Sequence, residues 1–141
     1  MASPILQPVA VLLGWTMLVW IWMYATRIPA MGKAKIDVGN LVGGTGGALD
    51  GVLPDQVQWK AHNYNHLMAE PTIFYATSLV LAIQGAGDGL NAKIAWAYVG
   101  LRIAHSLWQI LVNKVSIRFL LFALSSLCLM ALVLHAIIAV F

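Results

Sequence analysis

Residues 119–141 read FLLFALSSLCLMALVLHAIIAVF, a run of 23 residues that contains no Asp, Glu, Lys or Arg. An α-helix of about 20 apolar residues crosses the hydrocarbon core of a bilayer. The rest of the chain has a similar character, because 61% of its 141 residues are hydrophobic and only 9% are charged. Soluble domains contain roughly 45–50% apolar and about 25% charged residues. The sequence therefore predicts an integral protein of the lipid bilayer and excludes a disordered chain.

Three further apolar segments precede this run, and together they predict an all-α membrane protein with four transmembrane helices in an antiparallel bundle. We expect helices at about 4–27, 55–84, 90–113 and 116–140 in a single domain. Residues 28–54 are rich in Gly and should form a loop. The other two connections are short, which makes consecutive helices antiparallel neighbours. Met1–Thr26 contains no Lys or Arg, so we interpret it as a retained helix and not as a signal peptide.

The basic residues outside the apolar segments predict the orientation of the chain. Cytoplasmic connections carry an excess of Lys and Arg. Only Lys93 lies beside the connection between the second and third helices, which is on the same side of the membrane as both termini. We therefore predict that both termini are periplasmic in a bacterial inner membrane. The net charge of +3 comes from few, dispersed groups, and no nucleic-acid partner is expected. The basic residues on the opposite, cytoplasmic side are Arg27, Lys33, Lys35, Lys60, Lys114 and Arg118.

Two of the predicted helices each carry a stripe of polar residues on one face. Residues three or four positions apart lie on the same side of a helix. Ionisable groups at membrane depth are costly, so each is a candidate functional residue. The stripes comprise His62, Asn63, His66 and Glu70 in the second helix and Arg102, His105, Gln109 and Asn113 in the third.

Antiparallel packing should bring the two stripes together in one cleft that opens towards the cytoplasm. From the cytoplasmic end, Glu70 lies about 20 Å along its helix and Arg102 about 16 Å along the next, at a rise of about 1.5 Å per residue. We therefore expect Arg102 and Glu70 at similar depth, as a pair of opposite charges. Pro71 should bend the second helix beside the stripe. The same register predicts two further pairs, His66 with His105 and His62 with Gln109.

Three alternatives to a functional cleft follow from the same residues. Buried polar groups often only hold helices together, and a pair between Arg102 and Glu70 is explained equally well by packing specificity. His62, His66 and Glu70 have the spacing to share a metal ion. We expect no metal, because His residues are too few for a two-metal oxygenase site and no hydrolase motif is present. His135 has no polar neighbours in sequence and is expected to be a satisfied or interfacial residue.

The polar segments resemble a known family of membrane proteins. The resemblance rests on NYNHLMAEPTIFY at residues 63–75, RIAHS at 102–106 and RF at 118–119, in the same order of four helices. These motifs are similar to those of the MAPEG superfamily, the membrane-associated proteins in eicosanoid and glutathione metabolism, and in particular to its bacterial branch. The resemblance implies a homotrimer of four-helix subunits, with glutathione in a cleft between subunits and a lipophilic small molecule as its reaction partner.

The resemblance also assigns roles, with two departures from the family pattern. The family's Asn-x-x-Glu falls on His66-Leu67-Met68-Ala69, so the carboxylate is displaced by one position to Glu70, about 100° around the helix. Gln109 stands where the third-helix motif Arg-x-x-His-x-x-x-Tyr has its tyrosine. By resemblance, the catalytic residues are Arg118 and His105, and the glutathione-binding residues are Asn65, His66, Glu70, Arg102 and Gln109.

Two classes of function remain open at this stage. The first is a glutathione-dependent transferase or peroxidase in which Arg118 stabilises a thiolate that attacks a lipophilic electrophile or hydroperoxide. The two departures lead us to expect weak or no glutathione transfer. The second is a non-catalytic protein that binds a lipid or pigment, or an accessory subunit of a larger membrane complex.

Overall fold

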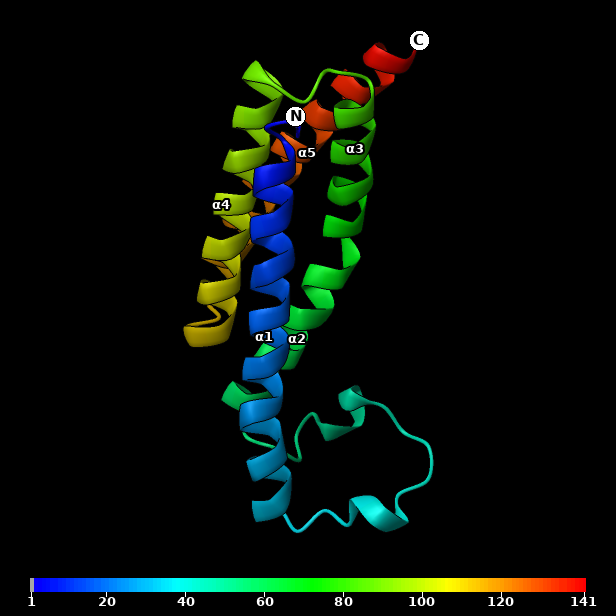
Figure 1. Ribbon diagram of the computed structural model, residues 1–141. Helices are drawn as coiled ribbons and strands as arrows, with labels where there is room; N and C mark the ends of the chain where they lie inside the picture. Colours follow the sequence, from blue (N-terminus) through cyan, green and yellow to red (C-terminus); the bar gives the residue numbers. More distant parts are fainter. Residues whose placement is uncertain (1) are drawn as a thin grey trace.

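The computed structural model describes residues 2–141 and contains five α-helices in a bundle (Figure 1). Met1, which we expect at the periplasmic side, lies outside these residues. The described part of the chain has no β-strand, which agrees with the all-α fold predicted from sequence. The helices are α1 (Leu6–Lys33), α2 (Asp55–Ala69), α3 (Pro71–Ile83), α4 (Gly89–Leu111) and α5 (Val115–Val140), and two 3-10 turns, Val38–Asn40 and Gly46–Leu49, lie in the long connection.

Helices α2 and α3 form one bent rod that is interrupted at Glu70 (Figure 1). Pro71 has no backbone N–H, so the carbonyl of Leu67 loses its helical partner at this point. Helix α2 packs against α1 and α4, whereas α3 packs mainly against α5. The bend therefore moves the rod from contact with α1 and α4 to contact mainly with α5.

Helix α1 continues to Lys33, so the expectation that a loop begins at residue 28 is wrong. Pro29 lies inside the helix, where it removes only one backbone hydrogen bond. The helix ends where Lys35 adopts a φ of 56°. The N–H of Ile36 then bonds the carbonyl of Met31 at 3.1 Å, and that of Lys35 bonds Gly32 at 3.2 Å. This Schellman arrangement, which a non-glycine residue seldom supports, sets the actual end of the helix.

Within residues 2–141, three helical segments are long and apolar enough to cross a membrane: Leu6–Lys33, Asp55–Ile83 and Val115–Val140. Helix α4 has 23 residues and lies alongside α5 (Figure 1). It is not among these three segments, and its sequence includes the charged residues Lys93 and Arg102. The fourth span thus remains a prediction, which rests on the length and position of α4.

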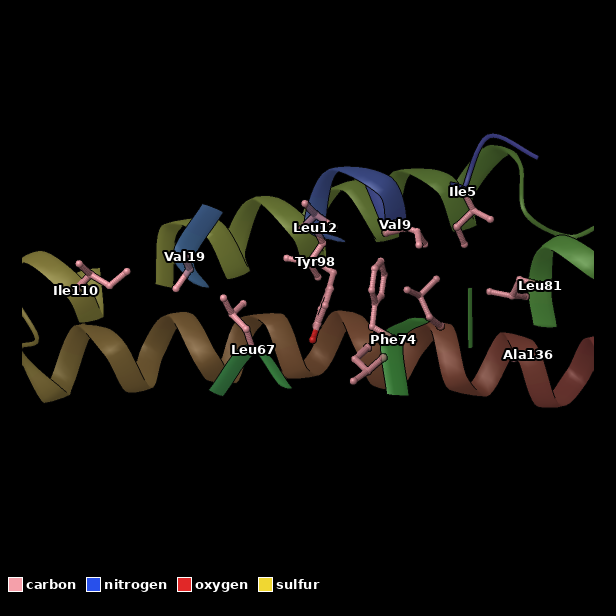
Figure 2. Close-up of a cluster of buried hydrophobic side chains, with 14 residues drawn as sticks. Ile5, Val9, Leu12, Val19, Leu67, Phe74, Leu81, Tyr98, Ile110 and Ala136 are labelled. Atoms are coloured by element: carbon pink, nitrogen blue, oxygen red, sulfur yellow. The ribbon is translucent and has the colours of Figure 1, made fainter. Parts of the chain in front are cut away.

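All five helices contribute side chains to the apolar core, and an aromatic pair forms its centre (Figure 2). The rings of Phe74 and Tyr98 stack with centroids 4.5 Å apart, and both side chains are fully buried. Val9 and Leu12 of α1 lie beside this aromatic pair. The outer faces of α1 and α5, by contrast, expose many large apolar side chains, as expected for surfaces in contact with lipid.

Both chain ends and the α3–α4 connection lie at one end of the bundle, and residues 34–54 lie at the other (Figure 1). The N–H of Ile5 bonds the carbonyl of Gly87 at 2.9 Å, which ties the start of α1 to this connection. His135 has no polar neighbours in sequence, but it has one in space, because its Nδ1 lies 2.6 Å from Oδ1 of Asn91. A residue from another helix supplied this partner, so the sequence neighbours of His135 could not reveal it.

Candidate functional site

Polar side chains of α2, α4 and α5 meet in three successive layers between these helices. The layer nearest to residues 34–54 joins α2 to α4, because Nδ2 of Asn63 donates to Oε1 of Gln109 at 2.9 Å. Both side chains are buried. The expected pair of His62 and Gln109 is therefore wrong. One residue corresponds to about 100° of helix rotation, and His62 instead points to Asp50 in the long connection, at 2.9 Å.

The middle layer places a buried guanidinium beside two imidazoles. Nη2 of Arg102 lies 2.9 Å from Nδ1 of His66 and also donates to the His66 carbonyl at 3.3 Å. Because a guanidinium can only donate, Nδ1 of His66 must accept, which assigns the ring proton to Nε2. The ring centroids of His66 and His105 are 4.7 Å apart, which agrees with the prediction that the two residues lie at the same depth.

Several polar atoms of this layer have no hydrogen-bond partner in the described part of the chain. They are Nε and Nη1 of Arg102 and both ring nitrogens of His105. Arg102 is completely buried and His105 almost completely. Buried polar atoms are normally satisfied by protein, water or ligand. These atoms therefore mark the middle layer as a place where a small polar molecule would gain hydrogen bonds.

The innermost layer holds the one carboxylate of the polar stripe. Oε2 of Glu70 accepts from the hydroxyl of Ser126 at 2.8 Å, and Oε1 accepts from the hydroxyl of Tyr98 at 3.3 Å. The expected ion pair between Glu70 and Arg102 is wrong, since residues 2–141 contain no salt bridge between the two. Depth alone suggested that pair, but hydroxyl groups of α4 and α5 lie closer to the carboxylate.

Beside the middle layer lies a pocket of about 160 Å³ that is lined by both imidazoles and by Arg118. Its walls are completed by apolar and aromatic side chains of α5: Val115, Phe119 and Phe122. Nη1 of Arg118 donates to Oδ1 of Asn113 at 2.6 Å. Asn113 has a φ of 56° in the tight connection between α4 and α5, so the turn itself orients the guanidinium.

The structure brings together most of the residues proposed from sequence, with one exception. His66, His105 and Arg118 share the pocket, Arg102 contacts His66, and Glu70 and Gln109 occupy the adjacent layers. Asn65 is separate: it is exposed and lines a different hollow beside α1 and the long connection.

Three residues that complete the layers, Tyr98, Phe122 and Ser126, were not predicted from the sequence. Spacing could have identified Tyr98. Tyr98 lies four residues before Arg102 on the same face of α4, and Phe122 and Ser126 follow Arg118 at intervals of four. Tyr98 and Ser126 bind Glu70, whereas the ring of Phe122 packs edge-on against His66 with centroids 5.4 Å apart.

Fold and site together define a class: a small helical integral membrane protein with an arginine-lined polar pocket between helices. The comparison with family models is consistent with this class. A model of the MAPEG family matches residues 5–138 of the 141-residue chain, and the chain belongs to this family. The comparisons with curated proteins and with solved structures gave no match.

Proposed function

We propose that the pocket beside Arg118 binds the thiol of glutathione, and that the protein is a slow glutathione-dependent transferase or peroxidase acting on lipophilic electrophiles. The observation that carries this proposal is the shared pocket of one guanidinium and two imidazoles under an apolar wall. A cation lowers the pKa of a neighbouring thiol. Phe119, which is 67% exposed, places this cation beside the lipid-facing surface from which an apolar substrate would arrive.

The chain's own residues suffice for the proton and charge transfers of this chemistry. In the neutral imidazole of His105 one ring nitrogen is a free acceptor, and it would take the thiol proton as the sulfur becomes a thiolate next to Arg118. In a transfer reaction the sulfur then forms a bond to the electrophilic carbon and the leaving group departs. With a hydroperoxide, the O–O bond breaks to give an alcohol and a glutathione sulfenic acid, which a second glutathione reduces to disulfide and water.

We expect this reaction to be slow because two groups that would bind glutathione are already engaged. Both oxygens of Glu70 accept hydrogen bonds from Tyr98 and Ser126, and Gln109 accepts from Asn63. Gln109 also has no acidic hydroxyl of the kind that a tyrosine would provide. Each group would have to exchange an internal partner for the ligand.

We also propose that a second copy of the chain completes the cleft, in a homotrimer. The pocket volume of about 160 Å³ is below the roughly 300–1,000 Å³ that is usual for small-molecule sites. The thiol end of glutathione fits into this volume, but the whole tripeptide does not. Native mass spectrometry in mild detergents should detect a trimer, and only monomer or dimer would count against the shared cleft.

The proposed orientation puts the Arg118 pocket in the cytoplasmic half of the inner membrane. The long connection and the α4–α5 turn, beside which most basic residues lie in sequence, are towards one end of the bundle. The α3–α4 connection, which Lys93 follows in sequence, is at the other (Figure 1). An alkaline-phosphatase fusion after Phe141 should be active, and one at Gly44 should be inactive. The reverse pattern would overturn this orientation.

The catalytic proposal is tested by glutathione-dependent loss of chlorodinitrobenzene and of cumene hydroperoxide with purified protein. Arg118→Ala should lower either rate by roughly 10- to 1000-fold, the effect of removing one preorganised electrostatic donor. Lys114→Ala is the matched control, because Lys114 is a nearby exposed cation that does not line the pocket. Robust turnover that survives Arg118→Ala would defeat the residue assignment.

One observation favours a non-catalytic lipid- or pigment-binding role as the second candidate. A wholly apolar groove of about 390 Å³ runs between α3 and α5, lined by Ile73, Leu129, Met130, Val133, Leu134 and Ile137. A lipid chain, a pigment or a helix of a larger complex would fit such a surface. Mass spectrometry of the purified protein would detect a retained apolar ligand, and the absence of thermal stabilisation by glutathione would then favour this function.

A further inference from the structure

A second polar hollow lies on the side of α2 that faces α1, apart from the Arg118 pocket. Its volume is about 460 Å³, and it lies between the last turns of α1, the middle of α2 and the long connection. Its lining includes Arg27, Thr45, Tyr64 and Asn65. None of these side chains lines the Arg118 pocket or takes part in the chemistry proposed for it.

The guanidinium of Arg27 is the distinctive feature of this hollow. Arg27 is only 9% exposed, and its one side-chain hydrogen bond within residues 2–141 runs from Nη2 to the neutral amide oxygen of Gln58, at 3.3 Å. Its Nε has no partner in the described part of the chain. Removing one charge from water is unfavourable unless an opposite charge or several hydrogen bonds compensate it. The cation therefore lacks the partner that its burial calls for.

Asp50, an acid whose charge interacts with that of Arg27, forms no salt bridge with it among residues 2–141. Oδ1 of Asp50 is held by Nε2 of Gln58 at 2.8 Å and by His62 at 2.9 Å. Nε2 of Gln58 also donates to the carbonyl of Gly46 at 3.1 Å. Gln58 thus stands between the acid and the guanidinium, fixes the long connection against α2, and leaves the face of Arg27 towards the hollow without an anion.

The local backbone brings the connection close to this cation. A Cβ atom on Gly46 would lie 3.1 Å from Nη1 of Arg27, which is closer than most such contacts, so the absence of a side chain lets the main chain lie directly against the guanidinium. Thr45, Tyr64 and Asn65, whose side chains carry neutral hydrogen-bond donors, also line this hollow. This is a donor set suited to an oxyanion.

The position of Arg27 along α1 indicates where such an oxyanion would come from. Trp20, Trp22 and Tyr24 lie within the two preceding turns, and aromatic residues of this kind concentrate at the level of lipid headgroups. Lys33 and Lys60 add positive charge at the same end of the bundle. Phosphate groups bind guanidinium ions through paired hydrogen bonds, and basic sites at this level recognise anionic lipids.

We propose that the hollow beside Arg27 is a binding site for a phosphate group, supplied by the headgroup of an anionic phospholipid. The bound phosphate would compensate the buried guanidinium and would couple the long connection to the membrane surface. This inference does not depend on glutathione chemistry.

The test compares thermal unfolding of the purified full chain with short-chain phosphatidylglycerol, phosphatidylcholine and inorganic phosphate. A ligand that binds only the folded state raises the melting temperature with its concentration. We expect the anionic lipid to stabilise the wild type more than the zwitterionic lipid. Arg27→Gln should weaken its apparent Kd by about tenfold or more, as expected for the loss of charge-assisted hydrogen bonds. Lys33→Gln, which alters an exposed cation near the hollow, should retain most of the affinity.

A second variant and a second ligand complete the experiment. If Arg27→Gln does not fold, Tyr64→Phe removes one donor of the hollow without touching Arg27, and a Kd weakened in this variant supports the site. Stabilisation by inorganic phosphate that Arg27→Gln abolishes would support the phosphate site with free phosphate as its source. Equal stabilisation of the wild type and folded Arg27→Gln by phosphatidylglycerol would overturn the proposal, as would stabilisation by neither phosphatidylglycerol nor phosphate.

Discussion

The bent rod of α2 and α3 makes two different kinds of contact on the two sides of Pro71. Before the bend, α2 meets α4 through hydrogen bonds of Asn63 and His66. After the bend, α3 packs through Phe74 and Leu81, which are completely buried. Apolar side chains gain little from leaving lipid, so the apolar half depends on close packing, whereas the polar half depends on specific partners. The candidate pocket lies in the polar half, where the helices are joined by groups that a ligand could also use.

The largest effect on stability should come from the centre of the apolar half. Phe74→Ala removes the ring that stacks on Tyr98, and we expect it to lower the free energy of unfolding by about 3–5 kcal/mol. Leu79→Ala on the same helix, where the side chain is half exposed, should cost far less. Reversible unfolding in mixed micelles measures both. Similar losses in the two variants would show that packing within the bundle has no advantage over contact with lipid.

A smaller but clear effect should follow from the innermost polar layer. Glu70→Leu leaves the hydroxyls of Tyr98 and Ser126 without their acceptor. We expect a loss of roughly 1.5–3 kcal/mol, the usual contribution of a hydrogen bond to a charged group. Glu70→Gln keeps one oxygen acceptor and should lose less in the same unfolding measurement. If Glu70→Leu is as stable as the wild type, this layer does not hold the helices together.

The outermost polar layer should contribute least to the stability of the bundle. Gln109→Leu breaks the bond to Asn63, and hydrogen bonds between membrane helices contribute about 0.6 kcal/mol on average. Asn63→Leu combined with Gln109→Leu should cost no more than the sum of the single variants, because each single change leaves a buried partner unsatisfied. A double variant that loses much more than this sum would mean that the pair has a larger structural role.

The pH dependence of the long connection gives the smallest expected effect and is confined to one loop. The Gln58 amide and then His62 hold the pKa of Asp50 below its usual value. A group whose pKa is lower in the folded state stabilises that state above its unfolded pKa, about 3.9, and loses this contribution as the pH falls through the lower folded value. Hydrogen exchange of residues 45–53 should be slower in the wild type than in Asp50→Asn near pH 6. The difference should shrink as the pH falls through the lowered pKa of Asp50, and one that grows on acidification would reverse this sign.

The antiparallel register of the two polar stripes could be predicted from sequence because one helix begins and the other ends at the same membrane surface. Counting the rise per residue put His66 and His105 at one level, and their rings are 4.7 Å apart. The same counting could not give the direction of each side chain around its helix. It therefore paired Arg102 with Glu70, although Tyr98 lies nearer to the carboxylate.

The contribution of α5 could not be predicted in the same way. Its sequence is apolar around the whole helix, so no periodic pattern indicates which face packs inward. Ser126 and Phe122 were therefore assigned to the site only from the structure.

The end of α1 was also predicted wrongly from the sequence. Arg27 and Pro29 resemble a helix end, but Arg27 is buried against the long connection, and the helix continues to Lys33.

The most direct test of the Arg118 pocket is the ultraviolet absorbance of the glutathione thiolate on the purified protein. With the wild type near neutral pH, we predict a thiolate signal on addition of glutathione, since Arg118 lines the pocket where the sulfur would lie. Arg118→Ala should reduce the signal by about tenfold or more, and Lys114→Ala should leave it unchanged. Glutathione that binds the wild type without forming a thiolate, or a thiolate signal that persists in Arg118→Ala, would contradict the account.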